Sequence, residues 1–494
     1  MRDDPRATGS GALDPEDWSS FAAVAHAAVD HAVDRIRTVR ERPVWRPIPP
    51  DVRAGFATPL PARPRPLGEV YEEVVTRILP YAMGNVHPRF WAWYMGAGDL
   101  TGALADFLAA VDGSNLGAGE SAASLVEQQV TDWIRQMMGF PKGASGALVE
   151  GGSMANIIGL MAARNAMAGA DLHRDGLAAM NRPLAFYASD QVHSCHDKAM
   201  NLLGLGSRTL RRVPTDESFR IDLGALRDAI EADRVRGLQP ACIVATAGST
   251  NTGSVDDLEA ISDLCRQEGI WMHVDGCIGA LLAIAPEHAH LVAGIERADS
   301  LALDLHKWLH APFGVGCVLM RDRKLHRETF AEDAEYLQRA TRGLAAGESL
   351  HDYTLETTRS FRALKVWMML KHHGVDAFGR SIDRNVAQAK HLTGLVQMEP
   401  ALELMAPTGT SVVCFRFNPG GMAESGLHDL NRELLLRLQE SGVAAPSDTT
   451  LRGRYCLRAA FCNHRTRLSD VELLASEVTK VGYELLRDTR TRTK

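Results

Sequence analysis

The chain has 494 residues, of which 45% are hydrophobic and 23% are charged, and its formal net charge is −7. This length gives room for two or more domains, each with its own core. The negative charge and the lack of a run dense in lysine and arginine argue against nucleic acid or an anionic membrane as the main partner.

Cysteine usage and the apolar stretches predict a cytoplasmic protein. The eight cysteines form no CxxC pair, which favours reduced thiols in a cytosol over a disulfide framework. The polar, acidic start MRDDPRATGSGALDPEDW does not resemble a signal peptide. In GALLAIAPEHAHLVAGI, the residues Pro286, Glu287 and His288 interrupt the apolar run too early for a membrane-spanning helix.

Residues 1–95 are predicted to form a helical and then proline-rich N-terminal arm. AVAHAAVDHAVDRIRTV has apolar positions at the three-to-four spacing of a helix. RPVWRPIPPDVRAGFATPLPARPRP cannot form a long helix, because proline removes backbone donors and fixes φ. Such an extended arm needs another surface to pack on, and a partner subunit is one candidate.

Residues 96–375 are predicted to form a large α/β domain. The short apolar runs LAFYAS, ACIVATAG, WMHVDG, SLALDL and GCVLMRD alternate with helical patterns such as SMANIIGLMAARNAM and VDDLEAISDLCRQEG. This alternation predicts a mainly parallel sheet that is covered by helices on both faces. In such sheets a ligand binds at the carboxyl ends of the strands.

The last third of the chain contains a predicted lid and a smaller domain. The charged stretch at 321–353 is predicted to be a helix followed by a mobile loop that closes over the site. Residues 376–494 contain SVVCFRF, LNRELLLRLQESG and YCLRAAF, which predict a small C-terminal α+β domain.

The first chemical motif is EGGSMAN at 150–156, where two glycines and a serine open a helix after a turn. Backbone N–H groups at that helix start, with Ser153 as cap and hydroxyl donor, make an anion site. An ordinary capped helix is the alternative interpretation. ATP is disfavoured, because the motif lacks the Lys-Ser/Thr pair of a nucleoside-triphosphate loop.

Two further motifs end neighbouring strands. In WMHVDG, His273 and Asp275 face the same side of a strand, and Asp275 stands at its carboxyl end. A carboxylate there can hold a protonated ring nitrogen, hold a metal, or cap a loop. In DLHKW, Lys307 follows 32 residues later, which leaves room for one crossover helix and one strand. The alternative for Lys307 is a strand-end lysine with its ammonium in water.

A phosphate-binding helix start, a carboxylate and a lysine at successive strand ends are what pyridoxal phosphate (PLP) requires. The carboxylate keeps the pyridine nitrogen protonated, and the lysine forms a Schiff base. His193, in SDQVHSCHDKA just past the strand LAFYAS, can cover the ring. His193, Cys195 and His196 also suggest a metal, but no second Cys/His cluster completes such a site, so we expect none.

The motifs HPRFWAW, EGGSMAN, SDQVHSCHDKA, ATAGSTNTGSVDD, HVDG, DLHKW and LRAAFCN resemble, in order and spacing, those of the group II PLP-dependent decarboxylases. These are relatives of aromatic L-amino-acid decarboxylase on the fold type I, aspartate-aminotransferase-like scaffold. The resemblance covers the chain from about residue 40 to the C-terminus. It implies a homodimer with the active site at the subunit interface and a small-molecule amino-acid substrate.

The resemblance also implies roles for individual residues. Lys307 would carry the cofactor, Asp275 would pair with the pyridinium nitrogen, and His193 would stack on the ring. The further implied contacts are Gly152 and Ser153 to the phosphate, Thr250 and His306 to the cofactor, Arg359 from a neighbouring subunit, and Asp256 and His273 as supporting residues.

Tyr336 carries the prediction of reaction type. It lies 29 residues after Lys307, where the family has a loop tyrosine thought to return a proton to Cα after CO₂ leaves. Relatives with phenylalanine there resemble oxidative aldehyde synthases. The resemblance therefore implies decarboxylation of an L-amino acid to a primary amine and CO₂. The alternatives are transamination, Cα–Cβ lyase chemistry, oxidative aldehyde synthesis, or a catalytically silent relative.

The substrate pocket is predicted from four positions that resemble wall residues of the aromatic-specific enzymes, namely Trp93, Tyr94, Asn115 and Phe313. Aromatic walls favour an aromatic or other bulky apolar substrate, because burying such a side chain contributes about 2 kcal/mol or more. Glu120, if it reaches the pocket, would favour a cationic or hydroxylated substrate instead.

Two positions depart from the family pattern. Asp304 replaces an asparagine-like residue, and a carboxylate near the phosphate would be unfavourable, so we expect it to face away or to pair with an arginine. Cys277, in HVDGC, is expected to be a small packing residue rather than a nucleophile.

Overall fold

The computed structural model describes residues 13–332 and 340–492. They divide into a first unit that ends at Gly84 and a second unit that begins at Asn85. The second unit includes residues 85–95, which the sequence patterns predicted as part of the N-terminal arm. There the strand β1 (Phe90–Trp91) pairs in parallel with β11 (Ala445–Leu451).

The first unit is helical, as its sequence predicts. Its elements are α1 (Trp18–Arg37), η1 (Val39–Glu41), α2 (Pro50–Ala54), α3 (Leu67–Glu73), η2 (Val74–Ile78) and η3 (Leu79–Tyr81). The carboxylate of Asp17 caps α1 by accepting the Ser19 N–H at 2.9 Å. The Tyr71 hydroxyl of α3 donates to the carbonyl of Ala27 in α1 at 3.2 Å. The proline-rich segment between these helices contains only the short α2.

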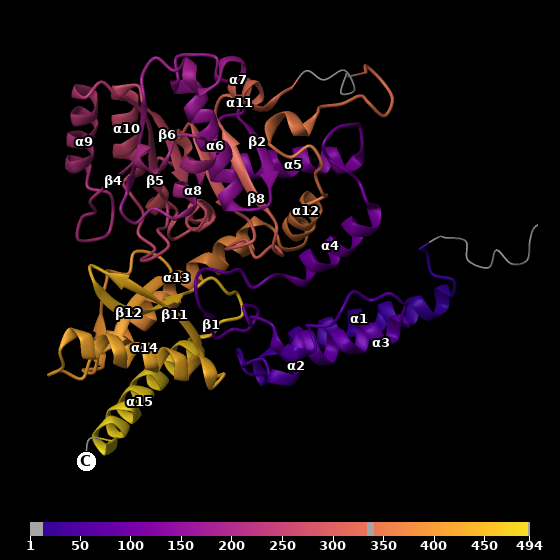
Figure 1. Cartoon of the computed structure of the whole chain (residues 1–494), viewed down its shortest axis with the longest axis vertical. Helices are drawn as coiled ribbons and strands as arrows, with labels where there is room; N and C mark the ends of the chain where they lie inside the picture. Colours follow the sequence, from indigo (N-terminus) through magenta and orange to yellow (C-terminus); the bar gives the residue numbers. More distant parts are fainter. Residues whose placement is uncertain (1–12, 333–339, 493–494) are drawn as a thin grey trace, which may run out of the picture. The chain divides into compact units, whose positions relative to one another are not determined.

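The large sheet of the second unit has seven strands in the order β2-β8-β7-β6-β5-β3-β4 (Figure 1). They are β2 (Ser145–Val149), β3 (Leu184–Ser189), β4 (Leu210–Val213), β5 (Gln239–Thr246), β6 (Trp271–Asp275), β7 (Ser300–Asp304) and β8 (Gly316–Met320). Only β8 runs antiparallel to its neighbours. The predicted α/β fold with a mainly parallel sheet is confirmed.

Helices cover both faces of this sheet. The face that carries the site packs against α6 (Gly152–Met167), α8 (Cys195–Leu202) and α11 (Arg323–Phe330), and the opposite face packs against α5 (Ala122–Met137), α9 (Leu223–Val235) and α10 (Leu258–Glu268). Ile158 of α6 and Phe186 of β3 belong to the core on the first face, and Ile261 of α10 belongs to the core on the second. The strands are therefore buried on both sides, which explains their continuous apolar runs.

The remaining helices of this part are shorter or lie at its edge. They are α4 (Leu100–Asp112), α7 (Leu172–Asp175), α12 (Ala363–His373), η4 (Leu177–Ala179), η5 (Ser207–Thr209), η6 (Ala280–Ile284), η7 (Ala289–Val292), η8 (Ile295–Arg297) and η10 (Leu350–Tyr353). Among the described residues, no helix is both long and apolar enough to cross a membrane.

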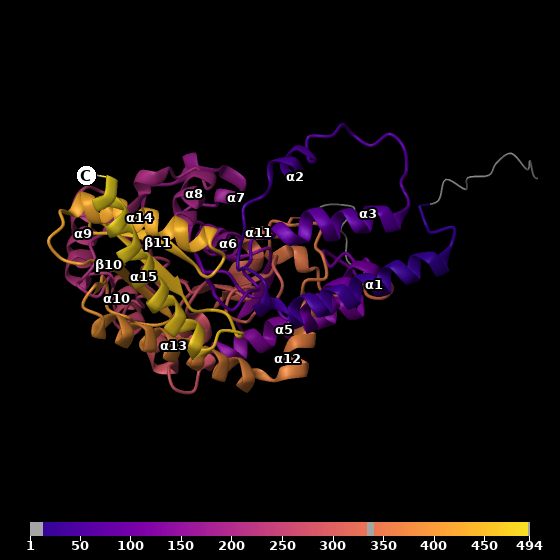
Figure 2. The ribbon, with the colours of Figure 1, turned by 90° about the horizontal axis from the view of Figure 1, so that it is seen from below.

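The C-terminal part of the second unit forms a five-stranded sheet in the order β1-β11-β12-β10-β9. Its other elements are β9 (Leu402–Leu404), β10 (Val412–Phe417), β12 (Arg454–Ala460), α13 (Val375–Met398), α14 (Glu424–Glu440) and α15 (Leu468–Arg492) (Figure 2). Phe415 and Phe417 of β10 pack against these three helices, whereas Cys414 belongs to the core of the large sheet. The small sheet is therefore attached to the large one through its second face.

Gly159 of α6 generates a prediction about the contact between this helix and the sheet. A Cβ atom at Gly159 would lie 2.5 Å from Cε1 of His273, whereas one at Gly394, in α13, would meet nothing within 4 Å. We expect Gly159→Ala to lower the free energy of unfolding by about 1–3 kcal/mol through overpacking. Gly394→Ala should raise it by about 0.5–1 kcal/mol. Urea unfolding midpoints of both variants test this, and equal effects would contradict the close packing of α6.

Candidate active site

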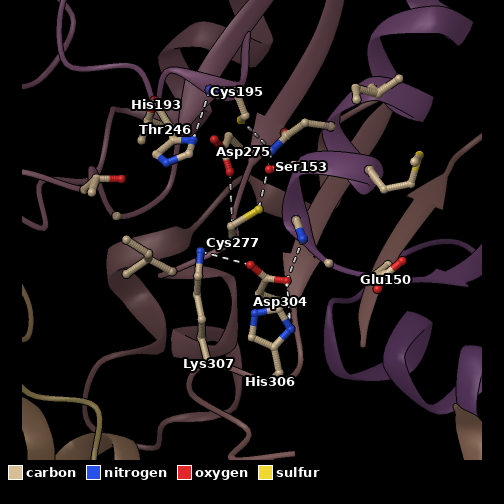
Figure 3. A pocket seen from close by; sticks show the side chains of 18 residues that line it. Glu150, Ser153, His193, Cys195, Thr246, Asp275, Cys277, Asp304, His306 and Lys307 are labelled. Atoms are coloured by element: carbon tan, nitrogen blue, oxygen red, sulfur yellow. Dashed lines mark hydrogen bonds and ion pairs between the residues drawn. The ribbon is translucent and has the colours of Figure 1, made fainter. Parts of the chain in front are cut away.

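A cavity of about 470 Å³ lies at the carboxyl ends of the strands (Figure 3). The side chains of Thr246, Asp275 and Asp304, which end β5, β6 and β7, all line it. Thr246 stands opposite Asp275 in the ladder, and Asp275 stands opposite Ala302. Because side chains alternate along a strand, the residues of matching parity all face α6.

Seven of the predicted site residues line this cavity together. They are Gly152, Ser153, His193, Thr250, Asp275, His306 and Lys307. They come from the start of α6, from the segment before α8, and from the ends of β5, β6 and β7 and the loops that follow. They meet at the carboxyl ends of the strands, where a mainly parallel sheet is expected to bind its ligand.

Lys307 and Asp304 form an ion pair within the cavity. The Nζ of Lys307 is 2.9 Å from Oδ2 of Asp304, and Oδ1 of Asp304 accepts the Gly152 N–H at 2.6 Å. Burial alone would lower the pKa of Lys307, but the charge of Asp304, with smaller contributions from Cys277 and Asp275, holds that pKa above its usual range. Lys307 is therefore a buried cation whose charge is balanced by the carboxylate of Asp304.

The expectation for Asp304 was wrong. Asp304 neither faces away from the site nor pairs with an arginine; it lines the cavity and is 4% exposed. Its parity in β7 directs it toward α6, where it is the partner of the Lys307 ammonium and of the Gly152 N–H at the start of the helix. Gly152 permits this approach, because a Cβ there would lie 2.7 Å from Oδ2 of Asp304 and 2.3 Å from Sγ of Cys277.

Asp275 is held from behind by His196. Its Oδ2 is 2.9 Å from Nε2 of His196, and its Oδ1 accepts the Cys277 N–H at 3.2 Å. Burial alone would raise the pKa of Asp275, but the hydrogen bond and charge of His196 outweigh it and hold that pKa well below its usual range. For His196, burial is again outweighed, and Asp275 and Cys195 raise its pKa to about 10. The site therefore contains a second buried ion pair.

The contact of His196 with Asp275 was not predicted from the sequence. His196 was considered only as a candidate metal ligand, because nothing in SDQVHSCHDKA indicates which strand end it meets. Cys195, His196 and Asp275 each place a ligand-type atom within 4.8 Å of the others, the only such group found in the described part of the chain. His196 Nε2 bonds Asp275 Oδ2, and Sγ of Cys195 accepts from the amide of Asn156 at 3.8 Å.

A second, uncharged network supports the floor of the cavity. His273 bonds Ser300 Oγ and Asn156 Oδ1, both at 2.8 Å, and burial lowers its pKa to about 3. The amide of Asn156 then donates to Sγ of Cys277 at 3.4 Å. Asp256 supports the end of β5 by accepting the Thr246 N–H at 2.7 Å. His273 and Asp256 thus each contact a residue that lines the cavity, and Asn156, which lines it too, is not among the predicted site residues.

His193 presents its ring to the cavity from the segment before α8. Its Nδ1 accepts the Cys195 N–H at 3.2 Å. The side chain of Cys195, rather than its N–H, raises the pKa of His193, although burial opposes it. The bond fixes the edge of the ring and leaves its face free to stack on a planar ligand.

Arg359 is not among the described residues that line the cavity. It is 1% exposed, forms an ion pair with Glu127, and donates to the Leu148 carbonyl at 2.8 Å. Its guanidinium is thus engaged within its own chain, where releasing it would leave Glu127 as a buried unpaired charge. Tyr336 lies outside the described residues.

The predicted substrate-wall residues do not line this cavity either. Trp93 is 54% exposed, and Phe313 is 51% exposed with its ring centroid 5.0 Å from that of His306. Tyr94 is buried, with its hydroxyl 2.9 Å from Ser411 Oγ. Asn115 accepts the backbone N–H groups of Gly117 and Arg359 at 3.0 and 2.9 Å.

The cavity fits PLP on three observations of its own residues. Lys307 supplies an amine at one position, and the ionised Asp275 supplies a proton acceptor at another. The start of α6, with Ser153, supplies the donors that a phosphate needs. The volume lies within the usual range for cofactor sites.

Comparisons with known proteins agree with this fit. Residues 49–418 match the family described as "Pyridoxal-dependent decarboxylase conserved domain". An aromatic-L-amino-acid decarboxylase of Bacillus atrophaeus is 32% identical over 94% of this chain and 95% of that protein. A phenylacetaldehyde synthase of a Rosa hybrid cultivar is 29% identical over 91% of this chain and 90% of its own.

A solved structure gives the same result for the fold and the cofactor. Oryza sativa TDC with PLP and tryptamine has a TM-score of 0.88 and 27% identity, covering 96% of this chain and 100% of that chain. The fold is therefore the expected fold type I scaffold, and the cofactor is PLP. The chain belongs to the pyridoxal-dependent decarboxylase family and is a PLP-dependent amino-acid carboxy-lyase.

Proposed function

We propose that this enzyme decarboxylates an aromatic L-amino acid to the corresponding primary amine and CO₂. The observation that carries the proposal is the placement of Lys307 and Asp275 on one cavity, each with a buried partner of opposite charge. The aromatic preference is supported by the relatives, one named an aromatic-L-amino-acid decarboxylase and one solved with tryptamine.

The bound PLP would supply an electron sink for the charge that develops at the substrate Cα. Lys307 would hold it covalently through Nζ. Asp275 would keep a proton on the ring nitrogen, since its carboxylate stays ionised in the buried site. His193 would cover the ring face, and Ser153, Thr250 and His306 would contact the cofactor.

Oxidative aldehyde synthesis is a second candidate reaction, because one relative is a phenylacetaldehyde synthase. The tyrosine at position 336 favours the amine-forming reaction, since we propose that its phenol returns the proton to Cα. Trp93, Tyr94, Asn115 and Phe313 remain our proposal for substrate-facing positions. Trp93 and Phe313 expose their rings and can contact a substrate directly.

We also propose a homodimer that uses α4. Five apolar residues at helical spacing on this helix are between 38% and 72% exposed, namely Leu100, Leu104, Phe107, Leu108 and Val111. An apolar stripe of this kind is typical of a protein interface. We propose that the active site lies beside this interface, which would complete its open walls.

Two further assignments follow from the same sequence patterns. We propose a functional division into an N-terminal arm, a large PLP-binding domain at 96–375 and a small domain at 376–494. We also propose a cytoplasmic location, which is supported by eight cysteines that are all free and buried.

The reaction is tested by product analysis with the common aromatic L-amino acids. The wild-type enzyme should release CO₂ and the primary amine in equal amounts. Tyr336→Phe should lower the amine released per CO₂ at least about tenfold, because a general acid contributes a factor of this size or more. Lys307→Ala is the control and should fix no PLP on borohydride reduction. A keto acid without CO₂ would contradict decarboxylation, and an unchanged amine yield would remove Tyr336 from the mechanism.

The dimer is tested by sedimentation velocity. We expect the wild-type protein to sediment as a dimer and Phe107→Glu to shift it toward monomer at micromolar concentration, because the charge would be buried at the interface. Val235 on α9 is 80% exposed and outside the stripe, so Val235→Glu is the matched control and should not dissociate. A monomeric, active wild type, or a dimer that resists Phe107→Glu, would contradict the proposal.

Asp304 is tested through the acid–base behaviour of Lys307. Removing the carboxylate should lower the lysine pKa, so that the neutral amine is available at lower pH. We expect Asp304→Asn to shift the pH profile for the rate of borohydride-fixable PLP attachment downward by at least about one unit, equivalent to about 1.4 kcal/mol. Asp322→Asn, at the exposed N-cap of α11, should leave the profile in place. A profile unmoved by Asp304→Asn would show that this carboxylate does not control the lysine.

A further inference from the structure

His196 stands directly behind the carboxylate that faces the cofactor site. It lies in the first turn of α8, and it is completely buried. Asp275 lines the cavity, whereas His196 is not among the described lining residues. Any effect of His196 on a ligand in the cavity therefore passes through Asp275.

The two donors to Asp275 fix the direction of its carboxylate. His196 Nε2 bonds Oδ2 at 2.9 Å, and the Cys277 N–H bonds Oδ1 at 3.2 Å. Each carboxylate oxygen can accept about two hydrogen bonds, so one acceptor position on each oxygen remains for the cavity. A carboxylate held at both oxygens cannot rotate away from a ligand without breaking a buried hydrogen bond.

The surroundings of His196 make Asp275 its principal partner. Its Nδ1 is buried and has no hydrogen-bond partner in the structure. Its other titratable neighbours are Cys195 and His273, whose ring centroid is 6.3 Å away. Cys195 also raises the pKa of His196, less than Asp275 does, and burial keeps His273 neutral. Of the groups that lower the pKa of Asp275, His196 contributes most, ahead of Cys277 and Lys307.

We propose that His196 is a positioning residue that keeps Asp275 ionised and aimed at the ring nitrogen of PLP. The inference rests on the proposed role of Asp275 and assigns to this chain a residue that acts on the cofactor only through that carboxylate. The contribution of His196 to cofactor binding must then depend on the presence of the ring nitrogen. A residue that merely packs α8 against the sheet would affect any ring of the same shape.

The test compares two cofactors that differ at the ring nitrogen, PLP and its 1-deaza analogue, in which C–H replaces that nitrogen. Dissociation constants are measured for both with the cofactor-free protein, by absorbance or fluorescence. Wild-type protein should bind PLP more tightly than the analogue. His196→Leu should weaken PLP binding about tenfold or more, as expected for a lost hydrogen bond to a charged group, and should leave binding of the analogue unchanged.

Two further variants distinguish the loss of the hydrogen-bond donor to Asp275 from a general destabilisation of the protein. His196→Gln can place an amide N–H near the position of Nε2, so it should recover most of the preference for PLP. His326 is also fully buried, and it bonds Ser145 Oγ at 2.8 Å and the Tyr353 carbonyl at 2.9 Å, away from Asp275. His326→Leu should therefore change the binding of both cofactors by the same factor.

The outcomes distinguish the two levels of the proposal. If wild-type protein binds PLP and the analogue equally, the proposed role of Asp275 fails, and the inference fails with it. If wild-type protein prefers PLP and His196→Leu keeps the full preference, the role of Asp275 stands and the inference about His196 is overturned. An equal loss for both cofactors in His196→Leu would assign His196 to packing alone and would also overturn it.

Discussion

A lysine ammonium inside a protein needs a carboxylate to match its charge, and in this enzyme the carboxylate is Asp304. The ion pair of 2.9 Å holds Lys307 on the cavity, while the same carboxylate accepts the first N–H of α6. Desolvation of a lone ammonium would cost several kcal/mol. The position of Lys307, and with it the chemistry of the site, depends on this one contact between a strand end and a helix start.

The sheet brings the two charge pairs of the site together. Asp275 and Asp304 end neighbouring parallel strands, with Asp275 opposite Ala302. Each carboxylate then takes a cation from a different element, Lys307 from the turn after β7 and His196 from α8. Because both pairs are buried, their electrostatic interactions are stronger than they would be at the surface. One sheet edge therefore supplies the carboxylates of both ion pairs.

The sequence predicted the strand ends well, because their positions follow from local patterns. Period-two alternation placed His273 and Asp275 on one face. The spacing to Lys307 predicted one crossover helix and one strand, and the structure has the three short helices η6, η7 and η8 before that strand. The same alternation applies to Asp304, which shares its face with Ser300, but the choice of its partner depends on where α6 begins in space. His196 shows the limit more clearly, since no local pattern indicates that this residue of α8 meets the end of β6.

Within one chain, the charged residues of the site have their hydrogen-bond partners, whereas the proposed apolar substrate-contacting residues are still exposed. Both ion pairs and the network from His273 to Cys277 are closed, with hydrogen bonds between 2.6 and 3.4 Å. Trp93 and Phe313, by contrast, are more than half exposed, as is Phe107 on α4. Exposed aromatic rings bind little until another surface buries them. In the proposed dimer, the residues that hold the cofactor would thus all come from one chain. The walls of the substrate pocket, which select the side chain of the amino acid, would be completed by contact with the second chain.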